Sequence, residues 1–361
     1  MGVKSIMNRR YDLDWIRDIT VISIIFFHSL IIFFTRESAV MYVRSGVNLK
    51  FCIYGEAVLS RISMPILFIL AGYSIKKSLE KRTVKEVISN RVRKLLFPFL
   101  IVSLTLNPLT SYIYGITQGR AITYCSHWLK FVTSISKDFE GRTTGYSPMH
   151  LWFILYLFIY SMICLPLFSK LDSSAWQKRF ERIAEILSRP YCLLLLVIPY
   201  PFIFFIEIMD EMNPIGYLYL FLTGYLLATS EKYQKALERD RWGYLFLAVL
   251  TIMVALYAWF VYDGDGNWFL PFCNKASRMC APMAVIGWGG VLISNRKCKV
   301  LEYLNKANYP IYLYHMAVLT VIGYLILKVK TASVLQFVLI NIISYGICFM
   351  LYEIYRRAIK N

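Results

Sequence analysis

Long apolar runs separated by short polar segments make up most of the chain. An apolar run of about 18 residues or more with few charges predicts a membrane-spanning helix. The pattern favours an all-α polytopic membrane bundle of about ten transmembrane helices, in which residues 1–361 form a single membrane-embedded domain with no separate soluble domain. The ten runs are centred on Ile25, Phe68, Leu104, Leu157, Val197, Leu220, Val249, Val285, Leu319 and Ile343.

Prolines interrupt three of the ten runs. Pro65 lies in the second run, Pro199 and Pro201 in the fifth, and Pro214 in the sixth. A proline removes one backbone hydrogen bond, but neighbouring helices of a bundle can satisfy the freed carbonyl. These three runs are therefore kept as expected spans, although the pattern is weakest there.

The basic residues lie in alternate connections between the runs. Lys and Arg are frequent in 76–94, 170–189, 232–241 and 296–306, whereas 207–211 and 263–274 contain none. Because cytoplasmic connections carry the excess of Lys and Arg, the first set is expected in the cytoplasm. Both termini are then cytoplasmic, and the long connection 115–149 lies outside. The expected location is the plasma or inner membrane, with a multi-pass topology.

Composition agrees with a membrane protein and disfavours two other classes. Hydrophobic residues make up 58% of the 361 residues and charged residues only 17%, so there is too little polar surface for a soluble globule. The formal net charge of +18 is typical of nucleic-acid binding, but the basic residues do not form one stripe or face. The expected partner is therefore the lipid bilayer and not a nucleic acid.

The cysteines do not indicate a metal site. None of the 8 cysteines forms a Cys-x-x-Cys pair, and most lie in apolar runs, where a thiol behaves as a small hydrophobic group. No metal is expected.

The first run carries the most informative polar side chains. Asp14, Arg17 and His28 lie in or beside it, and ionisable groups in a span are rare and usually face a cavity or a partner. Arg17 and His28 are eleven residues apart, so on a helix they point the same way, about 16 Å apart along the axis. A guanidinium at the inner end suits a phosphate-bearing ligand. The imidazole of His28 suits a general base or a nucleophile acting on a hydroxyl; the alternative is a structural histidine.

Two of the other three histidines each allow more than one interpretation. His150 opens a span and belongs either to an acceptor site or to an interfacial anchor. His315 lies beside Tyr314 within the ninth run, where it either hydrogen-bonds His28 or the acceptor or forms a packed polar pair. His127, in the outside connection, is expected to be solvated.

Four basic side chains are further candidates for ligand binding. Arg91 and Lys94 precede an inner helix end, where a basic cluster is either a topology signal or a site for a phosphate-bearing ligand. Arg61 and Arg278 lie at outer helix ends, where they either reach to the interface or orient a ligand.

Five motifs occur in order along most of the chain. The first span opens with LDWIR and has a His eleven residues after the Arg, and the others are MPILFILAGYS from Met64, RVRKLLFPF from Arg91, HLWFILYLFIYS from His150 and NYPIYLYHMAV from Asn308. This series resembles the membrane acyltransferase 3 family, and within it the branch that modifies glucans and other polysaccharides.

The resemblance implies a membrane O-acyltransferase that moves an acyl group, usually acetyl, from cytoplasmic acyl-CoA to a hydroxyl of an extracytoplasmic glycan. It assigns the catalytic positions to Arg17 and His28, and the binding of the acyl-CoA phosphates to Arg91 and Lys94. Lys94 departs from the family pattern, because it keeps the charge of an arginine but not the bidentate fork. The candidate supporting or acceptor-site residues are Asp14, His150, Tyr314 and His315.

A transporter or flippase for a glycan-related solute is the alternative function. Arg17, His28 and His315 would then lie along a substrate or proton path. Transporters often contain repeated halves, and none is visible in this sequence. Consumption of acyl-CoA separates the two functions, because transport needs only the movement of a solute.

Overall fold

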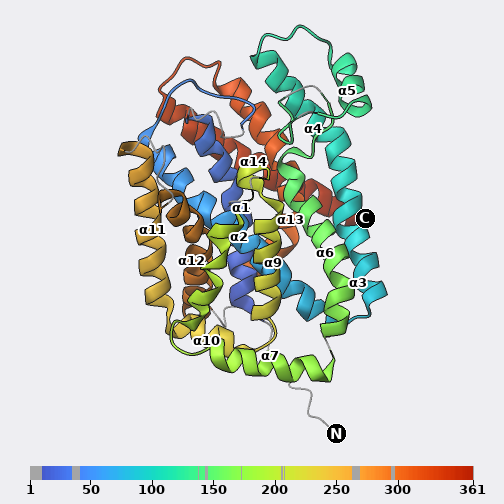
Figure 1. Cartoon of the computed structure of the whole chain (residues 1–361). Coiled ribbons are helices and arrows are strands. Elements are labelled where there is room, and N and C mark those ends of the chain that lie inside the picture. The colour runs from blue at the N-terminus through green and yellow to red at the C-terminus, as the bar shows by residue number, and fades with distance from the viewer. Residues whose placement is uncertain are drawn as a thin grey trace.

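The computed structural model describes residues 10–34, 41–136, 138–142, 145–171, 173–204, 206, 208–261, 269–293 and 297–360. Within these residues the regular elements are helices, and no β-strand is present. Most of the long helices run roughly along one axis of the molecule (Figure 1). The all-α, multi-pass membrane fold is therefore confirmed.

Six helical segments of the described chain are long and apolar enough to cross a membrane, and they contain six of the ten predicted centres. The segments are α1 (Tyr11–Ile32), α2 (Lys50–Leu79), α3 (Val84–Arg91) continued through a π-helical turn (Val92–Leu96) into α4 (Phe97–Thr117), α6 (Trp152–Leu171) with the 3-10 turn Met149–Leu151 before it, α13 (Lys299–Ile326) and α14 (Ser333–Lys360).

Three of the other four predicted centres lie in bent or shorter helices. α7 (Ser174–Leu187) and the segment Cys192–Ile203, which ends in α8 (Pro199–Ile203), are apolar enough only as a pair bent by 112°. α10 (Glu231–Arg239) and α11 (Arg241–Val261) form a second pair, bent by 66°. With each pair as one span, the described residues hold up to eight candidate spans.

Two further helices contain the remaining predicted centres. α9 (Pro214–Leu227) is a shorter apolar helix, and α12 (Phe269–Leu292) carries the centre at Val285. Two of the three proline-interrupted runs are thus a bent pair and a short helix, whereas α2 continues through Pro65. The count of ten spans and the side on which each terminus lies remain predictions.

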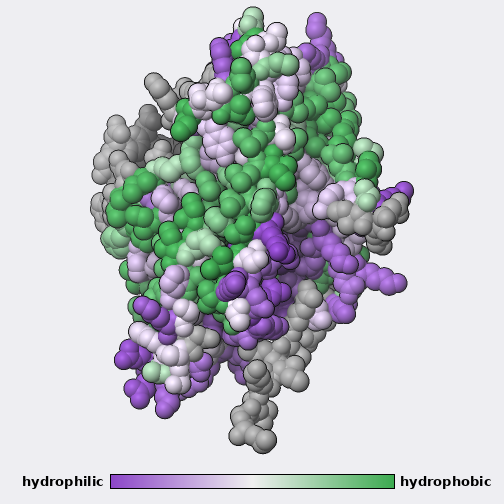
Figure 2. Space-filling view, turned by 90° about the vertical axis from the view of Figure 1, so that its right-hand side faces the viewer, coloured by the Kyte–Doolittle hydropathy of each residue, from purple (hydrophilic) through white to green (hydrophobic). Residues whose placement is uncertain are grey.

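The two ends of the bundle differ in character. α7 and α10 lie across the lower end in Figure 1, and α5 (Tyr124–Thr133) lies at the upper end. On the face in Figure 2, hydrophilic side chains gather in the lower half, and hydrophobic ones dominate above them. The lower end, which carries the basic connections around α7 and α10, is the predicted cytoplasmic end.

Two glycines allow α2 and α9 to cross in backbone contact. A Cβ atom on Gly72 of α2 would lie 1.8 Å from the carbonyl oxygen of Phe221, and one on Gly224 of α9 would lie 1.8 Å from that of Ile69. Small residues at helix crossings permit this close approach, which favours van der Waals packing in a bilayer. The crossing fixes α2, whose outer half lines the site described below.

α1 is the central helix of the region that contains the site. It packs against α2, α12, α13 and α14, and α13 also packs against α4. Because α1 contacts both α2 and α13, side chains from these three helices converge on one volume.

Candidate active site

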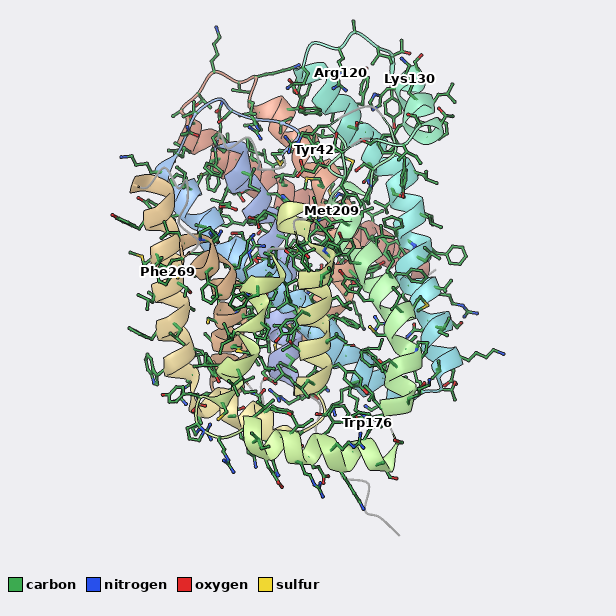
Figure 3. All side chains as sticks on the ribbon, viewed as in Figure 1. Tyr42, Arg120, Lys130, Trp176, Met209 and Phe269 are labelled. Carbon is green, nitrogen blue, oxygen red and sulfur yellow. The ribbon has the colours of Figure 1, made fainter. Side chains whose placement is uncertain are left out.

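A cavity of about 200 Å³ lies among α1, α2, α6, α9, α12 and α13. Residues from the connections border it as well, among them Tyr42, Glu140 and Met212. Tyr42 lies in the upper part of Figure 3, well away from Trp176 on α7 at the lower end. The cavity therefore belongs to the end of the bundle that is predicted to face the outside.

Three histidines from three different segments line this cavity. His28 comes from α1, His150 from the turn that opens α6, and His315 from α13. The ring centroids of His28 and His315 are 5.5 Å apart, and those of His150 and His315 are 5.1 Å apart. The fold thus brings together three of the sequence-predicted candidates.

Backbone carbonyls of α13 set the tautomers of two of these histidines. A carbonyl oxygen only accepts, so the ring nitrogen that contacts it must donate. His315 Nδ1 donates to the Tyr312 carbonyl at 2.7 Å, and His150 Nε2 donates to the Leu313 carbonyl at 3.2 Å. The opposite nitrogens, His315 Nε2 and His150 Nδ1, are buried without a hydrogen-bond partner among the described residues. In the neutral rings both of these nitrogens are free acceptors.

The backbone around His150 is also held in place. Tyr312 donates its hydroxyl to the His150 carbonyl oxygen at 2.7 Å, so α13 contacts both the ring and the main chain of this residue. Met149, directly before it, adopts φ 51°, a left-handed conformation that residues other than glycine seldom take. Backbone strain of this kind concentrates at functional sites.

His28 is the least constrained of the three rings. Its side chain is half-buried at the cavity wall, and its Nδ1 is buried. No hydrogen bond joins the imidazole to any residue that the structure describes, and its ring contacts are with Phe27 and His315. An imidazole of this kind can still accept a proton or a hydrogen bond.

Arg17 lies at the other end of α1 and does not line the cavity. It forms ion pairs with Asp14 at 3.4 Å and Asp18 at 3.1 Å, and it donates a hydrogen bond to Asn305 of α13. Arg17 and His28 therefore both contact α13, as the eleven-residue spacing predicts. Two carboxylates compensate the charge of Arg17, which weakens its attraction for a phosphate group.

Tyr314 is separated from the histidine cluster. Its hydroxyl donates to the Cys348 carbonyl oxygen at 2.8 Å, so the side chain is directed to α14. The neighbouring Tyr312 lines the cavity instead.

Arg91 and Lys94 lie where α3 passes into the π-helical turn before α4. Arg91 is half-buried, and Lys94 is exposed. Neither forms an ion pair or a hydrogen bond with any residue in the described part of the chain. A half-buried guanidinium without a carboxylate beside it is available to an anionic ligand.

Arg61 and Arg278 do not reach to the interface; both are buried and line the cavity, with 8% and 5% of their surface exposed. Arg61 donates to Asn274 at 2.7 Å, and Arg278 is paired with Glu211. These partners allow the guanidinium groups to remain inside the bundle, so the snorkelling interpretation was wrong.

His127 is likewise not solvated. It is only 2% exposed and packs in α5 against Tyr112 and Phe131. Burial, together with the charges of Arg120 and Lys130, lowers its pKa. The sequence placed it correctly in a connection but did not reveal that this connection folds over apolar surface.

Sequence reasoning missed a set of polar residues on α2. Glu56, Ser60 and Ser63 all line the cavity. Their spacing is i, i+4 and i+7, which places them on one face of a helix. A polar stripe within an otherwise apolar span was the signal that could have identified them.

Within the described residues, no group of three or more His, Cys, Asp or Glu side chains is arranged to hold a metal ion.

Comparison with known proteins gives one match. A family model described as an acyltransferase domain, that of the acyltransferase 3 family, matches residues 10–353 and so covers nearly the whole chain. No curated protein matches the chain. No solved structure matches it either.

Proposed function

Because the chain belongs to the acyltransferase 3 family, we propose that it moves an acyl group from cytoplasmic acyl-CoA to a hydroxyl of an extracytoplasmic glycan. That the chain is an acyltransferase follows from the family itself. The expected acyl group is acetyl, the expected branch is the one that modifies glucans and other polysaccharides, and the expected location is the plasma or inner membrane.

The observation that carries this proposal is the histidine cluster. His28, His150 and His315 share one cavity, and α13 carbonyls leave an acceptor nitrogen free on two of the rings. Acyl transfer to a hydroxyl needs a group that takes the hydroxyl proton, and a neutral imidazole does this near neutral pH. A base within the bundle that borders a cavity meets this requirement.

In the proposed reaction, His28 takes the proton of the acceptor hydroxyl while the hydroxyl oxygen attacks the thioester carbonyl. The C–S bond then breaks, the acyl group stays on the acceptor, and the proton passes from the imidazole to the departing CoA thiolate. An acyl-histidine formed on the same imidazole would be the two-step version of this transfer.

His315 is the proposed positioning residue for His28. Both His28 Nδ1 and His315 Nε2 are buried without partners, and the two rings are in contact. A hydrogen bond from the Nδ1–H of His28 to His315 Nε2 would satisfy both nitrogens and direct the lone pair of His28 Nε2 to the substrate. An orienting partner on the second imidazole nitrogen is a common arrangement for catalytic histidines.

Acyl-CoA, the acyl donor, would enter from the end of the bundle opposite to the histidine cavity. Arg91 and Lys94 have no counter-charge among the described residues, and they are the proposed contacts for the phosphates of acyl-CoA. The arm of acyl-CoA would have to carry the thioester along α1, past Arg17, to His28. Arg17 and His28 are about 16 Å apart along the helix axis, which is a distance that a long extended arm is suited to cover.

The experiment that tests this function uses the purified full chain in lipid vesicles. Labelled acetyl-CoA is supplied on one side and a crude surface glycan fraction on the other. Release of free CoA together with label on the glycan is the expected result. Movement of a glycan-related solute across the vesicle without release of CoA would instead establish the transporter.

A further inference from the structure

The polar stripe on the outer half of α2 has no part in the proposed proton transfer. Glu56 and Ser63 both line the cavity, and Ser63 is 3% exposed. Glu56 Oε2 and Ser63 Oγ are buried without hydrogen-bond partners. Glu56 also has no ion pair with any residue that the structure describes. Buried polar atoms are nearly always paired, so two unpaired ones on one cavity wall require a ligand or another explanation.

Glu56 lies close to the level of His28 along the bundle. His28 is four residues before the end of α1 and Glu56 six residues after the start of α2, or about 6 Å and 9 Å from the two adjacent helix ends. The helices touch at this level, because a Cβ atom on Gly55 would lie 2.9 Å from Leu30 Cδ1. A substrate hydroxyl at His28 would therefore have its neighbouring hydroxyls near Glu56.

The terminal guanidinium nitrogens of Arg61 and Arg278 already have partners, whereas Glu56 Oε2 has none among the described residues. Arg61 donates to the Ala57 carbonyl oxygen and to Asn274, and Arg278 is paired with Glu211. The Glu56 carboxylate can only accept hydrogen bonds. A ligand of this wall must accordingly bring donors, and an anionic group placed here would meet an unpaired carboxylate.

We propose that Glu56 is the specificity-determining residue for the acceptor. Its carboxylate accepts hydrogen bonds from hydroxyls of an uncharged sugar residue, and it disfavours glycans whose sugar units carry carboxylate groups. Ser63, two turns further along the same face, adds a weaker polar contact. The aromatic wall of Trp152 and Tyr217, whose ring centroids are 5.0 Å apart, borders the same cavity. This inference rests on the proposed function, because it concerns the acceptor of the same site.

Binding of oligosaccharides without acyl-CoA tests the inference separately from catalysis. The full chain is reconstituted in lipid nanodiscs and titrated calorimetrically with hexamers of neutral glucan, mannan and galactan, and with the hexamer of galacturonic acid. At least one neutral hexamer should bind more tightly than the acidic one. Glu56→Gln should weaken neutral binding about 10-fold or more, the size of one lost charge-assisted hydrogen bond. The same substitution should strengthen binding of the acidic hexamer.

Two further variants control the test. Ser63→Ala should weaken binding of the neutral hexamer by a smaller factor. Glu80→Gln, at the far end of α2 where Glu80 is paired with Lys77 at 3.0 Å, should leave binding unchanged. Unchanged thermal unfolding of Glu56→Gln shows that any loss of binding is local.

Three results would overturn the inference: no neutral hexamer binds, the acidic hexamer binds equally well, or Glu56→Gln binds like the wild type. A different result would show that the proposed function, and not the role of Glu56, is wrong. In that case oligosaccharide binding depends on Glu56 as described, but CoA is never released from acetyl-CoA.

Discussion

The imidazole of His28 on α1 faces that of His315 on α13, with the ring centroids 5.5 Å apart and the ring planes inclined by 30°. The two residues are far apart in sequence, and the packing of α1 against α13 brings them together. His315 is itself held by the Tyr312 carbonyl, so its position is set by the helix that carries it. A rigid His315 next to a free His28 is the arrangement expected of a positioning residue and its base.

Replacing His315 tests this relationship. His315→Ala should lower kcat for acyl transfer by about 10- to 100-fold and leave the KM for acyl-CoA unchanged, because the base is still present but is no longer oriented. Steady-state kinetics on the reconstituted enzyme measure both constants. His127→Ala removes another buried histidine, outside the cavity, and should keep full activity. Equal losses in the two variants would mean that His315 acts only through stability.

Arg91 and Lys94, the basic residues before α4, should contribute to the binding of acyl-CoA. Replacing both Arg91 and Lys94 with Gln should raise the KM for acyl-CoA about 10-fold or more, since charge-assisted bonds to phosphate groups are lost. The matched control replaces both Lys232 and Lys235 of α10 with Gln, where Lys232 already pairs with Glu185 at 3.2 Å. If both double variants change the KM alike, the cluster before α4 is only a topology signal.

The glycine crossing of α2 and α9 should be intolerant of side chains. Gly72→Ala or Gly224→Ala would place a methyl group against a backbone carbonyl that cannot move aside, at a cost of about 3 kcal/mol or more. Thermal unfolding in detergent should show a clear loss of stability. Gly346→Ala on α14, where no atom lies within 4 Å of the added methyl, should be neutral or slightly stabilising. A similar loss at all three positions would rule out the crossing as the cause.

Two native cysteines report the orientation of the bundle. Cys125 on α5 and Cys298 before α13 are both exposed. In variants that keep only one of them, a thiol reagent that cannot cross the membrane should label Cys125 on intact cells and Cys298 only after lysis. The opposite pattern would place the histidine cavity at the cytoplasmic end and contradict the predicted topology. A reporter placed near Lys137, in the connection 115–149, should also be outside; Lys137 itself lies outside the described residues.

Much of the fold could be predicted from the apolar runs. Each predicted centre lies in or beside a helix, because a run long enough to span a bilayer has few alternatives to a helix. The number of membrane spans was harder to predict from the sequence. The chain bends by 112° between Leu187 and Cys192, ahead of Pro199 and Pro201, and hydropathy alone does not distinguish a bent pair from a straight helix.

The site was predicted in part. His28, His150 and His315 could be identified as candidates because ionisable groups in spans are costly, but their convergence depends on how α1, α6 and α13 pack. Glu56 was missed although its spacing to Ser63 marks a helix face. The pairing of Arg17 with Asp14 and Asp18 was also not evident, because the sequence shows proximity along the helix but not which charges remain free.

His28 is the proposed proton acceptor, and the His28→Ala variant removes that group alone. The measurement compares acetyl-CoA consumption and the acylation of surface glycans, by mass spectrometry, between cells with the wild type and cells with the variant at matched membrane abundance. The variant should insert normally and reach normal abundance, since loss of a polar group does not hinder a membrane helix, and its rate should be lower by about 10²- to 10⁴-fold. Abundant His28→Ala protein with normally acylated glycans would contradict it.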